Sequence, residues 1–314
     1  MTSPQSLALC IPAYNAAAYL PRLLESANLQ QIPFDEIWVY DDCSTDETGL
    51  VAAKYGANVV RGDTNRGCSY GKNTLAERTS CDWIHFHDAD DLLLPNFTVE
   101  AHKWMNMNDP PDVVLMGFEY KDFYTNELLA TGLVDDHLLH LDPIGFSIRY
   151  KIPNFGIYKR NPIVNLGGFD CDPSILYNED VAFHTKLAIN GLSMRASNVI
   201  TSINWRYGSS MSQTNVSRCL LAQYAVMLKV ASQVQETYFS DVASNLWMTG
   251  QGLAVLEQWE NVDQVLESAL SLYPEVPLNL SWDFRLTCHL IGPKPAFRLR
   301  EYLIRIFKSK LRSH

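Results

Sequence analysis

The chain lacks an apolar run long enough to cross a membrane, and it lacks paired cysteines. Its seven cysteines are scattered, and no two stand at the C-x-x-C spacing of zinc or redox sites. The first residues carry neither a basic segment nor an apolar segment of signal-peptide length. We therefore expect reduced thiols packed as small apolar residues in a cytoplasmic protein, and contact with the inner face of the plasma membrane stays open.

The chain also has fewer basic than acidic residues. The 25 Lys and Arg residues face 35 Asp and Glu residues, a net charge of -10, which argues against nucleic acid as a partner. A nucleotide is not excluded, because a metal ion can invert the local field of an acidic pocket. With 47% hydrophobic residues in 314, the chain can bury a sizeable core, and its length favours one large domain with a smaller addition.

Strand-like and helix-like segments alternate through the first two hundred residues. Short apolar runs predict the strands, and apolar residues at helical spacing predict the helices between them. The predicted strands are 7–11, 36–40, 57–61, 83–87 and 113–120, and the predicted helices are 20–27, 46–55, 68–79, a helix opened by Pro95, and 179–190. This rhythm predicts a mostly parallel sheet with helices on both faces, in which ligands bind beyond the carboxyl ends of the strands.

Beyond about residue 212 the strand signals stop. Segments 219–234, 242–256 and 262–272 have helical patterns, so we predict a catalytic domain over 1–212 and a helical C-terminal region over 213–314. The weakly patterned stretch 123–153 fits a variable insertion or acceptor-side loops. The tail 297–314 carries six basic residues around an apolar stripe, which is typical of a basic amphipathic helix. That helix lies either on a membrane surface or against the rest of the protein.

The strand predicted at 83–87 ends in a cluster of carboxylates. Side chains two apart on an extended segment point the same way, so Asp88 and Asp90 can face one point beyond the strand. Mg²⁺ and Mn²⁺ prefer oxygen ligands and complete their shells with substrate phosphates. The pattern predicts a metal–diphosphate site, although turns and helix caps also produce Asp-x-Asp. Of His85 and His87, at least one is expected in the core.

A second pair of carboxylates, Asp41 and Asp42, follows the strand predicted at 36–40. A carboxylate at the rim of the ligand crevice can accept hydrogen bonds from a base N–H or from ribose hydroxyls. One of the residues at 44–46 caps the next helix, but a cap does not account for both carboxylates. We therefore favour a ligand role for Asp42.

Four motifs together resemble the family-2 inverting glycosyltransferases of GT-A fold, whose usual versions read P-x-Y-N, D-D-G-S-T-D, N-x-G with R-N, and D-x-D-D. The resemblance covers about residues 7–212, and G-G-F-D and E-D segments follow in the same order. The matching stretches are Ile11-Pro12-Ala13-Tyr14-Asn15, Asp41-Asp42-Cys43-Ser44-Thr45-Asp46, Asn65-Arg66-Gly67 with Lys72-Asn73, Asp88-Ala89-Asp90-Asp91, Gly167-Gly168-Phe169-Asp170 and Asn178-Glu179-Asp180.

The resemblance implies a nucleotide-sugar donor, a UDP-sugar first, with Mn²⁺ or Mg²⁺. Asp90, assisted by Asp88, would hold the metal, and Asp180, with Glu179 beside it, falls where the family keeps its general base. From the residues alone, Glu179 and Asp180 also fit the acidic first turn of a helix, and Lys72 also fits an exposed helical position. The donor-binding positions implied are Pro12, Ala13, Tyr14, Asn15, Asp41, Asp42, Gly67, Lys72, Asp88 and Ala89.

Three residues depart from the family pattern. Cys43 replaces the usual glycine, so its turn must accommodate a side chain. Lys72 replaces an arginine and keeps the charge but not the bidentate fork. In the segment 205–212, Tyr207 stands where many relatives place a metal-binding histidine, so we expect weaker metal binding or a shell completed by water.

The predicted activity is inverting transfer of a hexosyl or N-acetylhexosaminyl group. A single group is expected in each reaction, because the processive Q-x-x-R-W signature is absent. The expected acceptor is a hydroxyl of a surface glycan or of a lipid-linked saccharide. Two alternatives remain: a non-catalytic nucleotide- or sugar-binding protein of the same fold, and a sugar nucleotidyltransferase. The latter normally has a Gly-rich phosphate loop after its first strand, which this chain lacks. The sequence identifies neither the sugar nor the oligomeric state.

Overall fold

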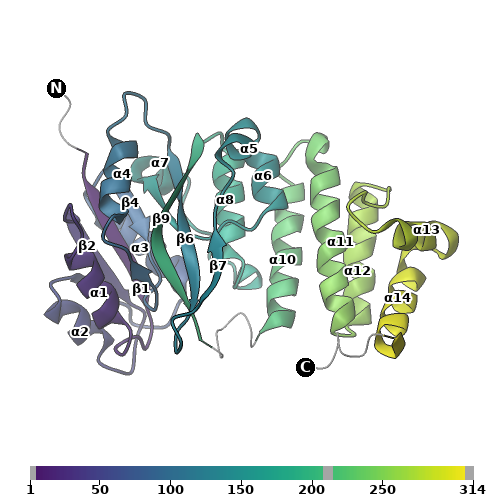
Figure 1. The fold of residues 1–314 in the computed structure, drawn as a ribbon, viewed down its shortest axis with the longest axis horizontal. Helices are drawn as coiled ribbons and strands as arrows, with labels where there is room; N and C mark the ends of the chain where they lie inside the picture. Colours follow the sequence, from purple (N-terminus) through teal and green to yellow (C-terminus); the bar gives the residue numbers. More distant parts are fainter. Residues whose placement is uncertain (1–4, 208–214, 308–314) are drawn as a thin grey trace. The chain divides into compact units, whose positions relative to one another are not determined.

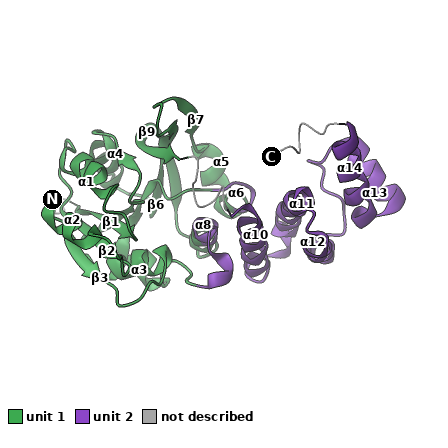
Figure 2. Ribbon diagram, turned by 90° about the horizontal axis from the view of Figure 1, so that it is seen from below, with its two compact units in different colours: residues 1–147, 152–171, 183–210 green, residues 148–151, 172–182, 211–314 purple. Residues whose placement is uncertain are grey.

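The computed structural model describes residues 5–207 and 215–307 and divides into two compact units. Unit 1 comprises residues 1–147, 152–171 and 183–210, and unit 2 comprises residues 148–151, 172–182 and 211–314 (Figure 2). Unit 1 combines a sheet with helices, and the secondary structure described in unit 2 is helical (Figure 1). The predicted α/β class with C-terminal helices is confirmed.

Nine strands of the described residues form one sheet in unit 1, in the order β3-β2-β1-β4-β8-β6-β9-β5, with β7 paired to β6. Strands β3, β2, β1 and β4 run parallel to one another, as predicted, whereas β4 pairs antiparallel with β8. In the other half, only the β6–β9 pairing is parallel. The strands are β1 Leu7–Ala13, β2 Glu36–Asp41, β3 Asn58–Arg61, β4 Trp83–Phe86, β5 Leu92–Leu93, β6 Val113–Asp122, β7 Leu128–Gly132, β8 Gly156–Lys159 and β9 Met194–Arg206.

Helices of unit 1 cover both faces of the sheet. The predicted helices 46–55, 68–79 and 179–190 appear as α2, α3 and α8, with no end shifted by more than two residues. The weakly patterned stretch 123–153 contains the hairpin strand β7 and two short helices. The helices up to α8 are α1 Leu20–Asn28, α2 Thr48–Lys54, α3 Cys68–Arg78, α4 Phe97–Met105, α5 Asp136–Leu141, α6 Pro143–Arg149, α7 Arg160–Asn165 and α8 Glu179–Ile189, with a 3-10 turn at Pro173–Ile175.

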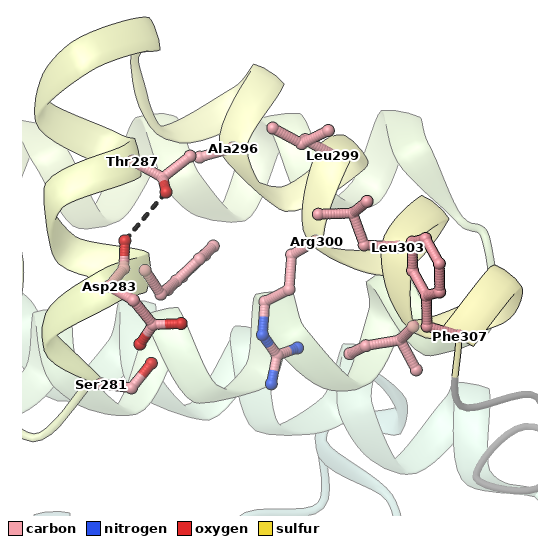
Figure 3. Close-up of a pocket in the computed structure, with 10 residues that line it drawn as sticks. Ser281, Asp283, Thr287, Ala296, Leu299, Arg300, Leu303 and Phe307 are labelled. Atoms are coloured by element: carbon pink, nitrogen blue, oxygen red, sulfur yellow. Dashed lines mark hydrogen bonds between the residues drawn. The ribbon is translucent and has the colours of Figure 1, made fainter.

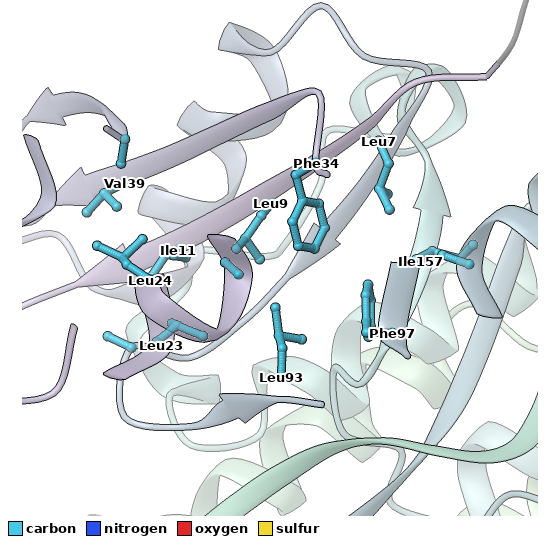
Figure 4. Close-up of a cluster of buried hydrophobic side chains, with 14 of the residues drawn as sticks. Leu7, Leu9, Ile11, Leu23, Leu24, Phe34, Val39, Leu93, Phe97 and Ile157 are labelled. Carbon is cyan, nitrogen blue, oxygen red and sulfur yellow. The ribbon is translucent and has the colours of Figure 1, made fainter. Parts of the chain in front are cut away.

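Strand β1 lies between two hydrophobic clusters. Its side chains alternate, so Leu7, Leu9 and Ile11 join α1, α2 and α4 in one cluster, whereas Ala8 and Cys10 join α3, α7 and α8 in the other (Figure 4). A fully buried leucine or isoleucine contributes about 1.5–3 kcal/mol to stability. Burial on both faces therefore fixes the position of the loop that follows β1.

Unit 2 consists of packed helices. Helices α11 and α12 form its core with Val242, Leu246, Trp247, Val265 and Leu266, all fully buried. No helix within the described residues is both long enough and apolar enough to span a membrane. The helices of unit 2 after α8 are α10 Val216–Ala231, α11 Phe239–Val255, α12 Trp259–Leu272, α13 Trp282–Ile291 and α14 Pro293–Phe307, with a 3-10 turn at Glu236–Tyr238.

Candidate active site

Three loops of unit 1 gather at one edge of the sheet. Strands β2, β1 and β4 are adjacent and parallel, so the residues that follow their carboxyl ends meet beyond the same edge. These residues are the loop starting at Tyr14, the carboxylates Asp41 and Asp42, and the segment 87–91. The structure thus brings together the clusters that the sequence analysis singled out in unit 1.

The loop after β1 is tied to the loop after β2. Asn15 has a left-handed backbone with φ 49, its N–H donates to Ser44 Oγ at 3.0 Å, and its Oδ1 accepts from Thr45 N at 2.9 Å. Pro12 and Ala13 are buried, whereas the side chain of Tyr14 is half-exposed. Tyr14 and Tyr19, which are 52% and 38% exposed, are therefore the aromatic side chains of this loop that solvent reaches.

The carboxylates of Asp41 and Asp42 make different contacts. Asp41 is fully buried, pairs with Arg61 and accepts from Ser44 N at 2.9 Å. Asp42 accepts from the N–H groups of Arg66 at 2.8 Å and Gly67 at 2.7 Å. Asp41 thus holds the turn together, and Asp42 holds the loop before α3. An ionised carboxylate has about four acceptor positions, so Asp42 retains lone pairs for a ligand.

Cys43 and Gly67 both adopt positive φ angles beside Asp42. The φ of Cys43 is 61, in the region that favours glycine, and its Sγ donates to the carbonyl of Asp63 at 3.4 Å. Gly67, with φ 85, begins α3 and can adopt this conformation without strain. The expectation that this turn accommodates the Cys43 side chain is confirmed.

Lys72 and Asp88 place opposite charges at the end of β4. Lys72 is 2% exposed, its Nζ lies 3.6 Å from Asp88 Oδ1, and it sits 5.0 Å from the ring centroid of Phe169. The Asp88 side chain is 55% exposed. Of the two positions considered for Lys72, an exposed helical position is wrong. The two charges offset each other, so a multiply charged anion would be attracted to this pair when a cation also neutralises Asp88.

Asp90 and Asp91 are carboxylates in a crowded acidic segment. Burial raises the pKa of Asp90, and the charge of Asp88 raises it further, against the opposing charges of Arg22 and Arg206. Burial raises the pKa of Asp91 well above its usual range as well. Asp91 is an internal group, since it accepts from Trp205 N at 3.0 Å and Asn204 Nδ2 at 2.7 Å.

Arg22 and Tyr207 hold the backbone of the carboxylate segment. Arg22 Nη2 donates to the Asp90 carbonyl at 3.0 Å and to the Tyr207 hydroxyl at 3.2 Å. Its guanidinium lies 4.9 Å from the ring centroid of Phe123 and 4.7 Å from that of Trp205. The Tyr207 hydroxyl in turn donates to the Asp90 carbonyl at 3.4 Å. Sequence reasoning missed Arg22, because a lone arginine on a helix carries no signal of a partner 68 residues away.

His85 and His87 form a buried pair with fixed proton positions. His85 Nδ1 lies 2.7 Å from the carbonyl of Gly156, which can only accept, so Nδ1 carries the proton. Burial lowers the pKa of His85 well below its usual value, and it lowers that of His87 to about 3. The neutral His85 Nε2 therefore accepts from His87 Nδ1 at 2.9 Å. Both rings are core residues, and the prediction that at least one is buried is confirmed.

A divalent cation fits the chemistry of Asp88 and Asp90. Their donor atoms are oxygens, and the raised pKa of Asp90 reflects a desolvated charge beside a like charge, which a cation relieves. Among residues 5–207 and 215–307, no three or more His, Cys, Asp or Glu side chains are arranged to hold a metal ion. Protein ligands would therefore be few, with water and diphosphate completing the shell.

Glu179 and Asp180 lie in the first turn of α8 and belong to unit 2. Two residues directly precede them. Tyr177 has a left-handed backbone with φ 77, and Asn178 Nδ2 donates to the Cys219 carbonyl at 2.6 Å. Both acidic side chains are partly exposed. Residues 208–214 lie outside the described residues. Of the segment 205–212, the structure therefore describes Trp205, Arg206 and Tyr207.

The G-G-F-D segment is anchored to α3 in unit 1. Asn73 Oδ1 accepts from Phe169 N at 2.7 Å, and Asn73 Nδ2 donates to the Phe169 carbonyl at 2.8 Å. Gly168 has φ 59, and a Cβ there would lie 2.1 Å from Asn73 Oδ1. The asparagine of the Lys72-Asn73 motif therefore positions the G-G-F-D loop.

The sheet and its acidic loops define a glycosyltransferase of the GT-A fold. The model of the family described as Glycosyl transferase family 2 matches residues 8–167, and the chain belongs to this family. The predicted resemblance and the enzyme class are therefore confirmed.

The chain is similar to curated glycosyltransferases of bacteria. It is 24% identical to the uncharacterized glycosyltransferase YibD of Escherichia coli over 97% of this chain and 84% of that protein. It is 35% identical to an uncharacterized glycosyltransferase of Haemophilus influenzae over 91 residues, which are 28% of this chain and 31% of that relative. The second match thus spans less than a third of the relative's length.

Two groups of solved structures share the fold. Staphylococcus aureus TarS 1-349 in complex with UDP-GlcNAc aligns with a TM-score of 0.72 and 19% identity over 96% of this chain and 92% of TarS 1-349. The mannosyltransferase PcManGT of Pyrobaculum calidifontis, in complex with GDP-Man and Mn²⁺, aligns with a TM-score of 0.62 and 17% identity over 96% of this chain and 88% of that protein. At these identities the likeness concerns the fold.

Proposed function

We propose that the protein transfers a single hexosyl or N-acetylhexosaminyl group, with inversion, from a UDP-sugar to a hydroxyl of a surface glycan or lipid-linked saccharide. The observation that carries the proposal is the buried Lys72 beside the open carboxylate of Asp88, at the sheet edge where the acidic loops gather. The nucleotide-sugar complexes of the similar structures support the donor class.

The donor residues have separate tasks in this proposal. The half-exposed Tyr14 and the free lone pairs of Asp42 receive the nucleoside, while Asn15 and Asp41 hold their loops. Lys72 offers its ammonium to the diphosphate. Pro12 and Ala13 shape the floor beneath the nucleoside, and Gly67 and Ala89 leave room beside the diphosphate.

Asp88 and Asp90 would hold Mn²⁺ or Mg²⁺, which when bound neutralises charge on the departing nucleoside diphosphate. Asp180 accepts the proton of the acceptor hydroxyl while that oxygen attacks the anomeric carbon. The bond from the anomeric carbon to the diphosphate oxygen breaks, and its electron pair leaves with the nucleoside diphosphate. Glu179 is the alternative base, and its position beside Asp180 provides a matched comparison.

The test is transfer from radiolabelled UDP-sugars to glycan acceptors, and donor hydrolysis without acceptor, by Asp180→Asn and Glu179→Gln. Loss of a general base lowers turnover by about 10² to 10⁴-fold, so Asp180→Asn should bind UDP as the wild type does but turn over slowly. A slow Glu179→Gln with an active Asp180→Asn would exchange the two roles. Two fully active variants, or a wild type that neither binds nor hydrolyses any UDP-sugar, would refute the proposal.

A further inference from the structure

Strand β9 ends at Arg206, beside the carboxylate segment of the active site. Strands β4 and β6 both pair antiparallel with β8, and β9 pairs parallel with its neighbour β6 (Figure 1). The carboxyl end of β9 therefore lies at the same sheet edge as the carboxyl end of β4, where ligands of such sheets bind. Trp205 N donates to the Asp91 carboxylate at 3.0 Å, and the Tyr207 hydroxyl donates to the Asp90 carbonyl. Both neighbours of Arg206 thus contact the carboxylate segment.

The guanidinium of Arg206 lies over an aromatic ring and has no hydrogen-bond acceptor in the part of the chain that the structure describes. It lies 4.1 Å from the ring centroid of Tyr120 on β6, and the side chain is partly exposed. No described carboxylate pairs with it. Asp122 stands opposite Arg206 in the β6–β9 register. Its carboxylate accepts instead from the backbone N–H groups of Tyr124 and Thr125, at 2.9 and 2.8 Å. The N–H donors of the Arg206 side chain are therefore open to a ligand.

Other arginines that lie over aromatic rings do have acceptors within the described structure. Arg300 of the predicted basic tail lines a cavity of about 420 Å³ between α13 and α14 (Figure 3). It lies 5.5 Å from the ring centroid of Phe284 and pairs with Glu301 at 3.3 Å. Residues 308–314 of that tail lie outside the described residues. The arginines with both a ring and an acceptor are Arg22, Arg66, Arg195, Arg298 and Arg300. The open donors of Arg206 are thus not a general feature of such arginines in this protein.

Arg206 is also close enough to Asp90 to act on its charge. Burial raises the pKa of Asp90, whereas the charges of Arg22 and Arg206 lower it. Arg22 is already bound to the Asp90 carbonyl, and Lys72 already pairs with Asp88. A guanidinium with open donors, beside carboxylates suited to a divalent cation, fits the charged oxygens of a diphosphate, because its planar fork matches a phosphate group.

We propose that Arg206 binds the diphosphate of the nucleotide-sugar donor and stabilises the negative charge that the nucleoside diphosphate acquires as it departs. This role rests on the proposed transfer reaction and adds a second cation, besides Lys72, to its donor site. The electron pair of the breaking bond passes to a diphosphate oxygen, and Arg206 donates hydrogen bonds to the charged phosphate without giving up a proton. Because Tyr120 already restricts the guanidinium, less side-chain freedom is lost when the donor binds.

The test is calorimetric titration of UDP with Mn²⁺ into the full-length wild type, Arg206→Gln, Arg206→Lys and the matched control Arg78→Gln. Arg78 is an exposed arginine at the last position of α3, and its replacement removes the same charge from unit 1. Binding of uridine, which has no phosphate, is measured by saturation-transfer NMR. We expect Arg206→Gln to bind UDP roughly tenfold or more weakly than the wild type, because charge-assisted bonds to phosphate are lost, and to bind uridine equally well. Arg206→Lys keeps the charge but not the fork, so its affinity for UDP should lie between the two. Arg78→Gln should bind UDP as the wild type does.

Four results would overturn the role of Arg206. Equal UDP binding by the wild type and Arg206→Gln would remove the contact with the diphosphate. An equal loss of uridine binding would place the effect on the nucleoside loops, and an equal loss in Arg78→Gln would leave only long-range attraction. Normal UDP binding with a raised KM for a phosphate-bearing acceptor would place Arg206 in the acceptor site. Each of these leaves the proposed transfer reaction standing, whereas a wild type that binds neither UDP nor any UDP-sugar would refute that reaction as well.

Discussion

Replacing Asp42 by asparagine tests the hydrogen bonds through which this residue holds the loop before α3. Asp42 is 4% exposed, and its two oxygens accept from Arg66 N and Gly67 N at 2.8 and 2.7 Å. In Asp42→Asn an amide group faces one of these N–H donors, so one charge-assisted hydrogen bond is lost. Such a bond is worth about 1.5–3 kcal/mol, and the remaining bond becomes a weaker neutral one. We expect the free energy of unfolding to fall by about 2–4 kcal/mol.

Urea denaturation of Asp42→Asn and Asp63→Asn measures this effect. Asp63 is an exposed aspartate of the neighbouring loop, so the same chemical change there should alter stability by less than about 0.5 kcal/mol. In our account Asp42→Asn also weakens UDP binding, because both the loop and an acceptor for the nucleoside are disturbed. An Asp42→Asn protein as stable as the control would refute the assigned hydrogen bonds.

Three further predictions concern neighbouring residues. Cys43→Gly should raise the free energy of unfolding by up to about 1 kcal/mol in urea, because φ 61 strains a side chain; a loss of stability would contradict this. Because the pKa of Asp90 is raised, its ionised form costs stability; Asp90→Asn should therefore stabilise the ligand-free protein at pH 7, and the gain should vanish as pH falls through the raised pKa toward 3.8. A pH-independent gain would refute the cause given. Tyr207→Phe removes the hydroxyl that contacts Arg22, so its free energy of unfolding should fall by about 1 kcal/mol. Calorimetry should still show Mn²⁺-dependent UDP binding by this variant. Loss of that binding would make Tyr207 a metal ligand.

Much of unit 1 was predictable because local pattern and tertiary burial agree there. The run at 7–11 is apolar at every position, which matches a strand buried on both faces, as β1 is. The carboxylates at 41–42 and 88–91 follow strands whose parallel pairing places their ends at one edge. The antiparallel half was not predictable, since short strands such as β5 and β8 have no pattern that sets their direction.

The contacts of single charged residues could not be predicted from the sequence. Lys72 lies on α3 among polar neighbours, and its burial depends on Phe169, about a hundred residues further along the chain. Arg22 likewise depends on Phe123 and Trp205. Such contacts arise from the assembled fold, whereas periodicity reports only which face of an element is apolar. The carboxylates of α8 differ again, because their proposed role rests on their place in the family motif.

The most direct test of the account is calorimetric titration of UDP with and without Mn²⁺ into the wild type, Asp90→Ala and Asp109→Ala. Asp109 is an exposed aspartate between α4 and β6, and it serves as the matched control. We expect Mn²⁺ to strengthen UDP binding by the wild type and by Asp109→Ala but not by Asp90→Ala. Equal strengthening by Mn²⁺ in Asp90→Ala would contradict a donor diphosphate site at Asp88 and Asp90.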